Sequence, residues 1–243
     1  MYTTMAIDVE TSKDPVMFPW QEGSFVVAIG IALETGFRKS WVFNHNESQL
    51  YSIANIKGVG NLRQFDCQQD MLTEIQLYLN MVHRLVGHNL KFDLNWLHLL
   101  GLDTSHLKYW CTQVTEYLLR GQREIGRLKL TDLSKQYLNI DKIDRVKMMW
   151  DAGYETSDIP LNILIPYLEQ DCINPLAIYQ RQVPKVKEEG LQHIVTLQNE
   201  TTRIWSAIEC NGMGFDLETA RNYAKDLSEE LEDIDYHLHK AFS

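Results

Sequence analysis

Hydrophobic and polar positions in the first part of the chain follow the pattern of a β-meander. Residues 2–9 (YTTMAIDV) form a strand-like run that ends in acids, and residues 25–33 (FVVAIGIAL) form a continuous, β-branched and apolar run. Residues 38–44 (RKSWVFN) alternate as an outer strand does. Gly36 lies between the last two runs and indicates a hairpin turn. The pattern therefore predicts three consecutive strands.

Helix and strand patterns alternate after this meander. A helix is expected to begin near Asp66, which we predict to be its N-cap, because apolar residues then recur at helical spacing. Residues 84–88 (RLVGH) predict a short strand, 91–100 (KFDLNWLHLL) a helix, and 108–111 a last strand. Helical patterns dominate from there on, including a helix over residues 161–182.

This order of elements indicates the fold class. Three strands followed by helix, strand, helix, strand and further helices is the order of an α/β ribonuclease H-like domain, a mixed β-sheet flanked by helices. We expect this domain over residues 1–186. The composition turns polar around residues 184–190 (PKVKEEG), which predicts a domain edge there. Residues 187–243 are expected to form a C-terminal helical segment.

The last predicted helix carries a heptad pattern. It begins after Asp216, a predicted N-cap. Its apolar residues recur at alternating spacings of three and four, namely Leu217, Ala220, Ala224, Leu227, Leu231, Ile234 and Leu238. Such a seam needs a partner helix, and the preceding apolar pattern over residues 191–208 can cover one side of it.

Composition restricts the class of protein. Of the 243 residues, 44% are hydrophobic and 23% charged, as in an average soluble protein. Apolar runs are short and the N-terminus resembles no signal peptide, so we expect neither a membrane span nor secretion, and a cytoplasmic location. The 4 cysteines are far apart and form no CxxC pair, which argues against a zinc site or a disulfide framework.

Four acids stand at chemically suggestive positions. Asp8 and Glu10 are two residues apart at a strand end, so both side chains lie on one face, where they repel unless a cation or a raised pKa relieves them. Asp93 begins a helix, and Asp171 lies four residues after Tyr167 on one helix face. Each has an ordinary alternative. Asp8 and Glu10 could lie where a strand enters solvent, and Asp93 could be an acid that the helix macrodipole favours. Asp171 could be a solvated acid on a helix.

Together these residues resemble the DEDDy group of 3′→5′ exonucleases. The three motifs stand in the group's order and in the expected elements: Asp8-x-Glu10, Asn89-x-x-Phe92-Asp93 and Tyr167-x-x-x-Asp171. A tyrosine near the last aspartate, rather than a histidine, marks the DEDDy subgroup.

The resemblance extends to the proofreading domain of family A DNA polymerases. It is carried by residues 87–97 (GHNLKFDLNWL), 110–119 (WCTQVTEYLL), 167–179 and 209–216 (ECNGMGFD), and covers about residues 3–216. It implies a 3′→5′ exonuclease that hydrolyses the terminal phosphodiester of DNA and releases nucleoside monophosphates.

The polymerase half of such an enzyme is not expected in this chain. No motif for nucleotide addition is present, and residues 187–243 resemble only the first (thumb) helices of a polymerase domain. From the start at Met1 we expect no preceding 5′-nuclease domain. This arrangement would resemble bacteriophage polymerases more than bacterial ones and would imply a location in the host cytoplasm. The chain is expected to be either a fragment or a subunit whose polymerase half is another polypeptide. At Cys111-Thr112 bacterial relatives have Asp-Thr, but that aspartate is no metal ligand.

The resemblance implies a cofactor and roles for the site residues. Two Mg²⁺ ions, with Mn²⁺ as a substitute, suit an all-oxygen donor set. Asp8 would bridge both ions, Glu10 and Asp171 would complete the first site, and Asp93 would contact the second. Tyr167 would orient the attacking water, because a phenol with an ordinary pKa near ~10 is a poor base at neutral pH.

Substrate contacts are expected beside the carboxylates. The resemblance implies that Thr11 lies near the 3′-hydroxyl and that Asn89 and Phe92 lie near the terminal nucleotide, although Asn89 also suits a turn. Phe18 and Trp20 could stack on a splayed base or anchor their loop. A set of basic residues could track phosphates, with a solvated face favoured for most of them: Arg120, Arg123, Arg127, Lys129, Lys142, Arg145 and Lys147. His83, His88 and His98 have no metal-site spacing and are interpreted as structural.

Net charge at first argues against a nucleic-acid partner. The formal charge is −10, but six acids crowd residues 226–235, away from the motifs. Two divalent cations would change the charge to −6, which is −10 + 4. Residues 120–147 hold eight basic side chains against four acidic ones, so the charge is unevenly distributed.

We therefore expect single-stranded DNA 3′ ends and a polymerase domain as partners. Two alternatives stay open on the sequence: an exonuclease acting on RNA, and a non-catalytic module that binds DNA ends or assembles with a separate polymerase chain. The retention of all four carboxylates and the tyrosine favours the enzyme.

Overall fold

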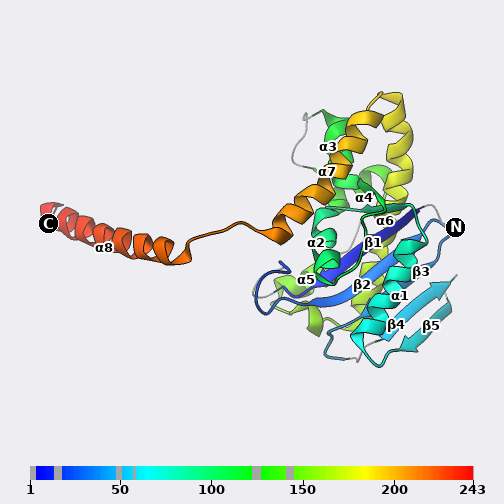
Figure 1. Ribbon diagram of the computed structural model, residues 1–243, viewed down its shortest axis with the longest axis horizontal. Helices are drawn as coiled ribbons and strands as arrows, with labels where there is room; N and C mark the ends of the chain where they lie inside the picture. Colours follow the sequence, from blue (N-terminus) through cyan, green and yellow to red (C-terminus); the bar gives the residue numbers. More distant parts are fainter. Residues whose placement is uncertain are drawn as a thin grey trace. The chain divides into compact units, whose positions relative to one another are not determined.

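The computed structural model contains a seven-stranded mixed β-sheet with helices on both faces (Figure 1). The structure describes residues 4–13, 18–47, 51–56, 59–121, 127–140 and 145–242, with the backbone alone between residues 51 and 63.

The strands lie in the spatial order β5-β4-β3-β2-β1-β6-β7. Their bounds are β1 (Thr4–Thr11), β2 (Val26–Leu33), β3 (Arg38–Val42), β4 (Tyr51–Ile56), β5 (Val59–Gln64), β6 (Arg84–Gly87) and β7 (Lys108–Cys111). The first five strands pair antiparallel in sequence order, whereas β6 pairs parallel with β1 and β7 parallel with β6. Strand β1 therefore lies inside the sheet, where the antiparallel and parallel parts meet.

Helices follow the meander and alternate with the last two strands. Their bounds are α1 (Gln68–Asn80), α2 (Lys91–Leu99), α3 (Thr112–Arg120), α4 (Leu130–Leu138), α5 (Arg145–Asp151), the 3₁₀ turn η1 (Thr156–Asp158), α6 (Leu161–Glu188), α7 (Gln192–Asn211) and α8 (Leu217–Phe242).

The predicted fold class, a ribonuclease H-like mixed sheet flanked by helices, is confirmed. Two local predictions were wrong. The meander has five strands rather than three, because the polar residues of β4 and β5 obscure the alternation that marks a strand. Helix α1 is capped by Cys67 rather than Asp66, and no side chain accepts a hydrogen bond at that cap.

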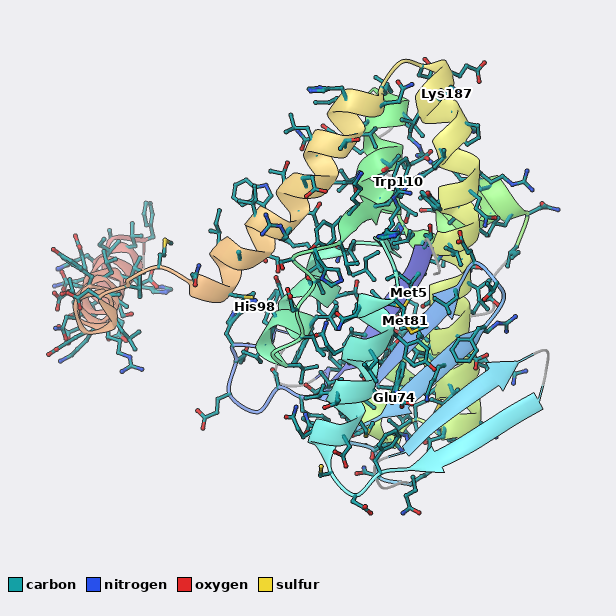
Figure 2. All side chains as sticks on the ribbon, turned by 45° about the vertical axis from the view of Figure 1, so that its right-hand side comes forward. Met5, Glu74, Met81, His98, Trp110 and Lys187 are labelled. Carbon is teal, nitrogen blue, oxygen red and sulfur yellow. The ribbon has the colours of Figure 1, made fainter. Side chains whose placement is uncertain are left out.

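Alternation along β1 sends its side chains to two different layers. Met5, labelled in Figure 2, is fully buried and packs with Ile7 and Val9 in the core that α1 and α2 cover. Ala6 points to the opposite face, where it packs against α6. Since successive strand residues face opposite sides, Asp8 and Glu10 share the α6 face with Ala6.

A buried polar network fixes the helices at the far end of α6. The Glu116 carboxylate accepts hydrogen bonds from Arg120 (2.8 Å), Tyr137 (2.7 Å) and Gln182 (3.1 Å). The Gln182 side chain also accepts from the indole N–H of Trp110 at 3.0 Å, a residue labelled in Figure 2. These bonds join α3, α4, α6 and β7 and satisfy a carboxylate that is only 1% exposed.

The chain divides into two compact units, Met1–Cys210 and Asn211–Ser243. Helix α7 belongs to the first, where the Asn95 amide donates to the Glu209 carboxylate at 3.0 Å. Helix α8 begins where predicted, with the Asp216 side chain accepting from the Thr219 amide at 3.0 Å. The domain division at residue 187 stays a prediction. Within the described residues, no helix has the length and apolarity that crossing a membrane requires.

Candidate active site

A glycine opposite the first motif lets α6 approach the sheet. Gly30 on β2 pairs with Asp8 on β1. A Cβ atom at Gly30 would lie 2.7 Å from the Leu168 Cγ and 3.0 Å from the Cys172 Sγ, both on α6. The absence of a side chain at this position thus allows α6 to pack directly on the sheet, which brings Asp171 close to the acids of β1.

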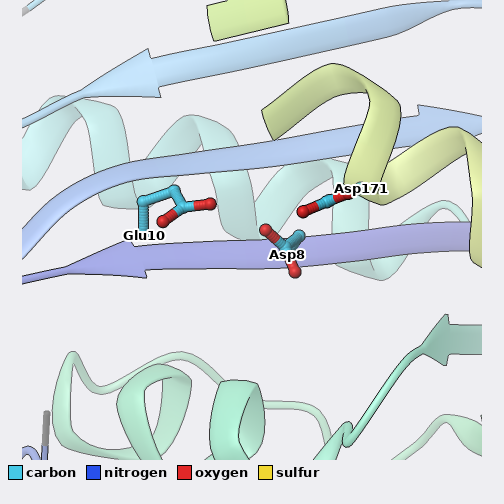
Figure 3. Close-up of side chains that lie close together, drawn as sticks. All are labelled: Asp8, Glu10 and Asp171. Carbon is cyan, nitrogen blue, oxygen red and sulfur yellow. The ribbon is translucent and has the colours of Figure 1, made fainter. Parts of the chain in front are cut away.

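Three of the predicted carboxylates meet at this place. Asp8 and Glu10 from β1 and Asp171 from α6 each offer an oxygen, and these oxygens lie within 4.8 Å of one another (Figure 3). Glu10 and Asp171 are each only 7% exposed. Carboxylates this close and this poorly solvated repel strongly. An all-oxygen donor set of this kind fits a hard divalent cation.

The fourth carboxylate reaches the site from the opposite layer. Asp93, in the first turn of α2, accepts a hydrogen bond from the Val9 amide at 3.0 Å, between the two acids of the first motif. Burial raises its pKa well above the usual range, and the Asp8 carboxylate raises it further. A neighbouring cation would relieve this penalty, so Asp93 also fits a metal-binding role.

Tyr167 stands one helical turn before Asp171, as the motif spacing predicts. Its ring meets the ring of Trp150 edge-on, with centroids 6.0 Å apart and planes at 81°. The Trp150 indole N–H donates to the Thr156 hydroxyl at 3.2 Å. The α5–η1 segment therefore packs against one side of the Tyr167 ring.

A cavity of about 230 Å³ joins these residues. The carboxylates Asp8, Glu10, Asp93 and Asp171 line it together with Tyr167. Thr11 and Phe92, two of the predicted substrate-binding residues, line it as well. The register of β1 against β2 shifts between Glu10 and Thr11, so the strand departs from regular pairing at the cavity.

Asn89, the third predicted substrate-binding residue, is not among the described residues that line the cavity. It is exposed in the turn between β6 and α2, with a φ of 58°. Its carbonyl accepts from the Phe92 amide at 2.9 Å. This conformation suits the turn-forming alternative, and a role toward the nucleotide stays a prediction.

Several cavity residues were not assigned to the site from the sequence. These residues are Val9, Ser12, Lys13, His88, Trp150 and Thr156. The Lys13 ammonium donates to the Trp150 carbonyl at 2.6 Å, and the Lys13 amide donates to the Glu155 carboxylate. These contacts join segments more than 130 residues apart in the sequence, so no local spacing of residues could have predicted them.

The aromatic pair in the loop after the first motif is half-exposed. Phe18 and Trp20 stack on each other, with centroids 5.3 Å apart and planes at 6°, and are 46% and 48% exposed. Stacking on a base stays a prediction. Among the basic residues, Arg120 is bound to Glu116, whereas Arg123 and Lys142 lie outside the described residues.

His88 gives this site a pH-dependent contribution to stability. Its ring accepts or donates a hydrogen bond at the Thr112 hydroxyl (2.9 Å). Burial lowers its pKa from 6.5 to about 4, against an opposing backbone hydrogen bond with Leu128. Between these values the unfolded chain binds a proton that the folded chain does not, so stability falls as the pH falls through this window.

We expect His88→Gln to flatten this dependence. The free energy of unfolding of the wild type should decrease between about pH 6.5 and 4 more steeply than that of the variant. Urea titrations of both proteins at several pH values measure the difference. Parallel pH profiles would contradict this expectation, because they would show that folding does not lower the pKa of His88.

The ribonuclease H-like sheet, with carboxylates of β1 and α6 clustered in one cavity, is the arrangement that the 3′→5′ exonuclease motifs imply. The family model described as "3'-5' exonuclease", that of family A DNA polymerases, matches residues 31–187, more than half of the chain. The chain therefore belongs to this exonuclease family. Asp93, Tyr167 and Asp171 fall within the matched segment, whereas Asp8 and Glu10 precede it.

One curated protein and several solved structures are similar to the chain. DNA polymerase DpoZ of Salmonella phage PMBT28 is 22% identical over 208 residues, which is 81% of this chain and 29% of that polymerase. Brucella melitensis NrnC with bound Mg²⁺ has a TM-score of 0.57 at 15% identity, covering 89% of this chain and 90% of NrnC.

A polymerase structure shares the fold as well. The POL domain of Pol1 from M. smegmatis, in complex with DNA primer-template and dNTP, has a TM-score of 0.58 at 13% identity, covering 94% of this chain and 32% of the other. The chain thus spans less than a third of the DNA polymerases that it matches.

Proposed function

We propose that the chain hydrolyses the terminal phosphodiester at the 3′ end of single-stranded DNA, releases nucleoside monophosphates, and proofreads for a family A DNA polymerase. The observation that carries the proposal is the cluster of Asp8, Glu10 and Asp171, whose oxygens lie within 4.8 Å in one cavity with Tyr167. Similarity to a phage DNA polymerase supports DNA as the substrate.

The carboxylates would hold two divalent cations, Mg²⁺ or Mn²⁺. Asp8, Glu10 and Asp171 would bind one, and Asp8 together with Asp93 would bind the second. When bound, the cations would lower the pKa of the attacking water and offset the charge on the phosphate. The raised pKa of Asp93 supports this assignment, because a buried carboxyl beside Asp8 is costly to ionise without a cation.

The remaining cavity residues would position the substrate. Tyr167 would orient the attacking water through its hydroxyl, held laterally by the Trp150 ring. Phe92 and Trp150 give the cavity apolar walls, which would pack against the terminal nucleoside and exclude bulk water. Thr11, at the cavity edge of β1, would lie near the 3′-hydroxyl.

Residues 187–243 would belong to the start of the polymerase part. The apolar seam of α8 is exposed, including Leu227 at 58% and Leu231 at 63%. An uncovered heptad seam of this length is suited to packing against further helices.

The substrate assignment is tested by comparing labelled strands that differ in one property. A primer with a mispaired 3′ end should be shortened faster than the same primer fully paired, because a frayed end reaches the cavity without unpairing. A DNA strand should be shortened faster than RNA of the same sequence. Equal rates on paired and mispaired ends would remove the proofreading role, and faster cleavage of RNA would favour the RNA exonuclease.

Tyr167→Phe should reduce turnover by about 10²-fold or less, since it removes an orienting contact and leaves the carboxylates in place. Single-turnover rates in Mg²⁺, compared with those of Asp171→Ala, measure this difference. Tyr154→Phe, at a 49% exposed tyrosine, is the matched control and should behave as the wild type. Equal losses in Tyr167→Phe and Asp171→Ala would contradict the division of roles.

A further inference from the structure

A second cavity shares Tyr167 with the carboxylate site. It has a volume of about 250 Å³ and is formed by α5 and α6. Tyr167 lines both cavities, and α5 contributes to both as well, through Trp150 in the first and Arg145 in the second. The second cavity is thus adjacent to the carboxylate site and shares a wall with it.

The polar groups of this cavity differ in charge from those of the carboxylate site. Arg145 is the one charged residue among the described residues that line it. Asn162 and Gln170 add two side-chain amides. The Gln170 amide donates one N–H to Asn174, which leaves its second N–H for another acceptor. The cavity therefore presents hydrogen-bond donors around a permanent positive charge.

These donors lie along the helix face that leads to the catalytic carboxylate. Asn162, Pro166, Tyr167 and Gln170 recur at helical spacing on α6, and Asp171 follows Gln170 directly. A strand whose 3′ end lies at Asp171 can therefore continue past Tyr167 along this face.

A nucleic-acid substrate is expected to need donor groups or positive charge along its path. A nucleic-acid strand carries a negative charge at every phosphate, whereas the carboxylate site and the whole chain, at −10, are acidic. An arginine side chain presents donors in a planar fork that matches a phosphate group. Arg145 is exposed and accessible to such a ligand.

We propose that Arg145, with the amides of Asn162 and Gln170, binds a backbone phosphate on the 5′ side of the phosphodiester that is cut. The cavity thereby fixes the path of the strand and favours substrates longer than a dinucleotide. This inference rests on the proposed function for the position of the 3′ end. The contact between Arg145 and a phosphate can be tested by binding alone, without any cleavage.

Binding of a labelled hexanucleotide DNA in EDTA, over a range of salt concentrations, tests the phosphate contact. Arg145→Gln should weaken binding about 5- to 50-fold at low salt and reduce the slope of log K against log salt by about 0.7, the value for one phosphate of a single strand. Arg145→Lys should keep the slope. Lys108→Gln is the control, because Lys108 is exposed on β7, lies outside the basic set named above and lines neither cavity.

Cleavage in Mg²⁺ locates the phosphate relative to the cut. Arg145→Gln should raise KM for the hexanucleotide and leave it unchanged for a dinucleotide without a 5′-phosphate, which has no phosphate beyond the scissile one. Two results would overturn the proposal. One is an Arg145→Gln variant whose binding has the same salt slope as the wild type, and the other is a variant whose KM rises equally for the hexanucleotide and the dinucleotide. If the wild type binds with the expected slope but cuts nothing, the proposed function fails while the phosphate site stands.

Discussion

Replacing Asp8 by alanine should reduce the rate of DNA shortening by about 10³-fold or more while leaving the chain folded. Asp8 belongs to the three-carboxylate cluster and would contact both cations, so its loss removes several kcal/mol of stabilisation from the transition state. Single-turnover cleavage of a labelled strand in Mg²⁺ measures the loss. Asp70→Ala, at an exposed acid in the first turn of α1, is the control and should cut normally.

Thermal unfolding of the same variant shows whether Asp8→Ala loses activity because a catalytic group is missing or because the fold is destabilised. In EDTA, Asp8→Ala should unfold at the same temperature as the wild type or higher, because the Asp8 carboxylate raises the pKa of buried Asp93 and its removal relieves that repulsion. Mg²⁺ should raise the unfolding temperature of the wild type alone. A variant that unfolds at lower temperature in EDTA, or that retains activity, would contradict the role given to Asp8.

Gly30→Ala should lower both stability and activity, although residue 30 contributes no functional group. The new Cβ would lie 2.7 Å from the Leu168 Cγ, so α6 has to move away from the sheet. We expect a loss of about 1–3 kcal/mol in the free energy of unfolding, as for other overpacked cores. Since α6 carries Asp171, turnover should also fall, by about 10²-fold for a shift of 1 Å.

Urea unfolding and single-turnover rates measure these two effects. Gly214→Ala is the control, because a Cβ there meets no atom within 4 Å. Combining Gly30→Ala with Leu168→Ala removes the clashing side chain, so the double variant should be less destabilised than the two single effects predict together. Additive effects, or a Gly30→Ala protein as stable and active as the wild type, would show that α6 does not depend on this close approach.

The sequence predicted the parts of the site that depend on local periodicity. Period two places Asp8 and Glu10 on one strand face, and the helical repeat places Tyr167 and Asp171 on one helix face. That these two pairs meet, with Asp93 beside them, followed only from the resemblance to known exonucleases. Local pattern carries no information on which strand a helix covers.

The missing parts of the site depend on contacts between distant segments. Lys13 reaches the carbonyl of Trp150, and the importance of Gly30 becomes visible only where Leu168 and Cys172 pack against it. Neither residue stands in a motif or breaks a local rule. Tertiary packing, rather than propensity, brings them to the site.

The measurement that tests the account most directly is the release of mononucleotides from a 5′-labelled single-stranded DNA, in Mg²⁺ and in EDTA. The account predicts that the wild type shortens the strand stepwise from its 3′ end in Mg²⁺, and that EDTA stops the reaction. A folded wild-type protein that leaves the strand intact with Mg²⁺ and with Mn²⁺, or that cuts equally well in EDTA, would contradict it.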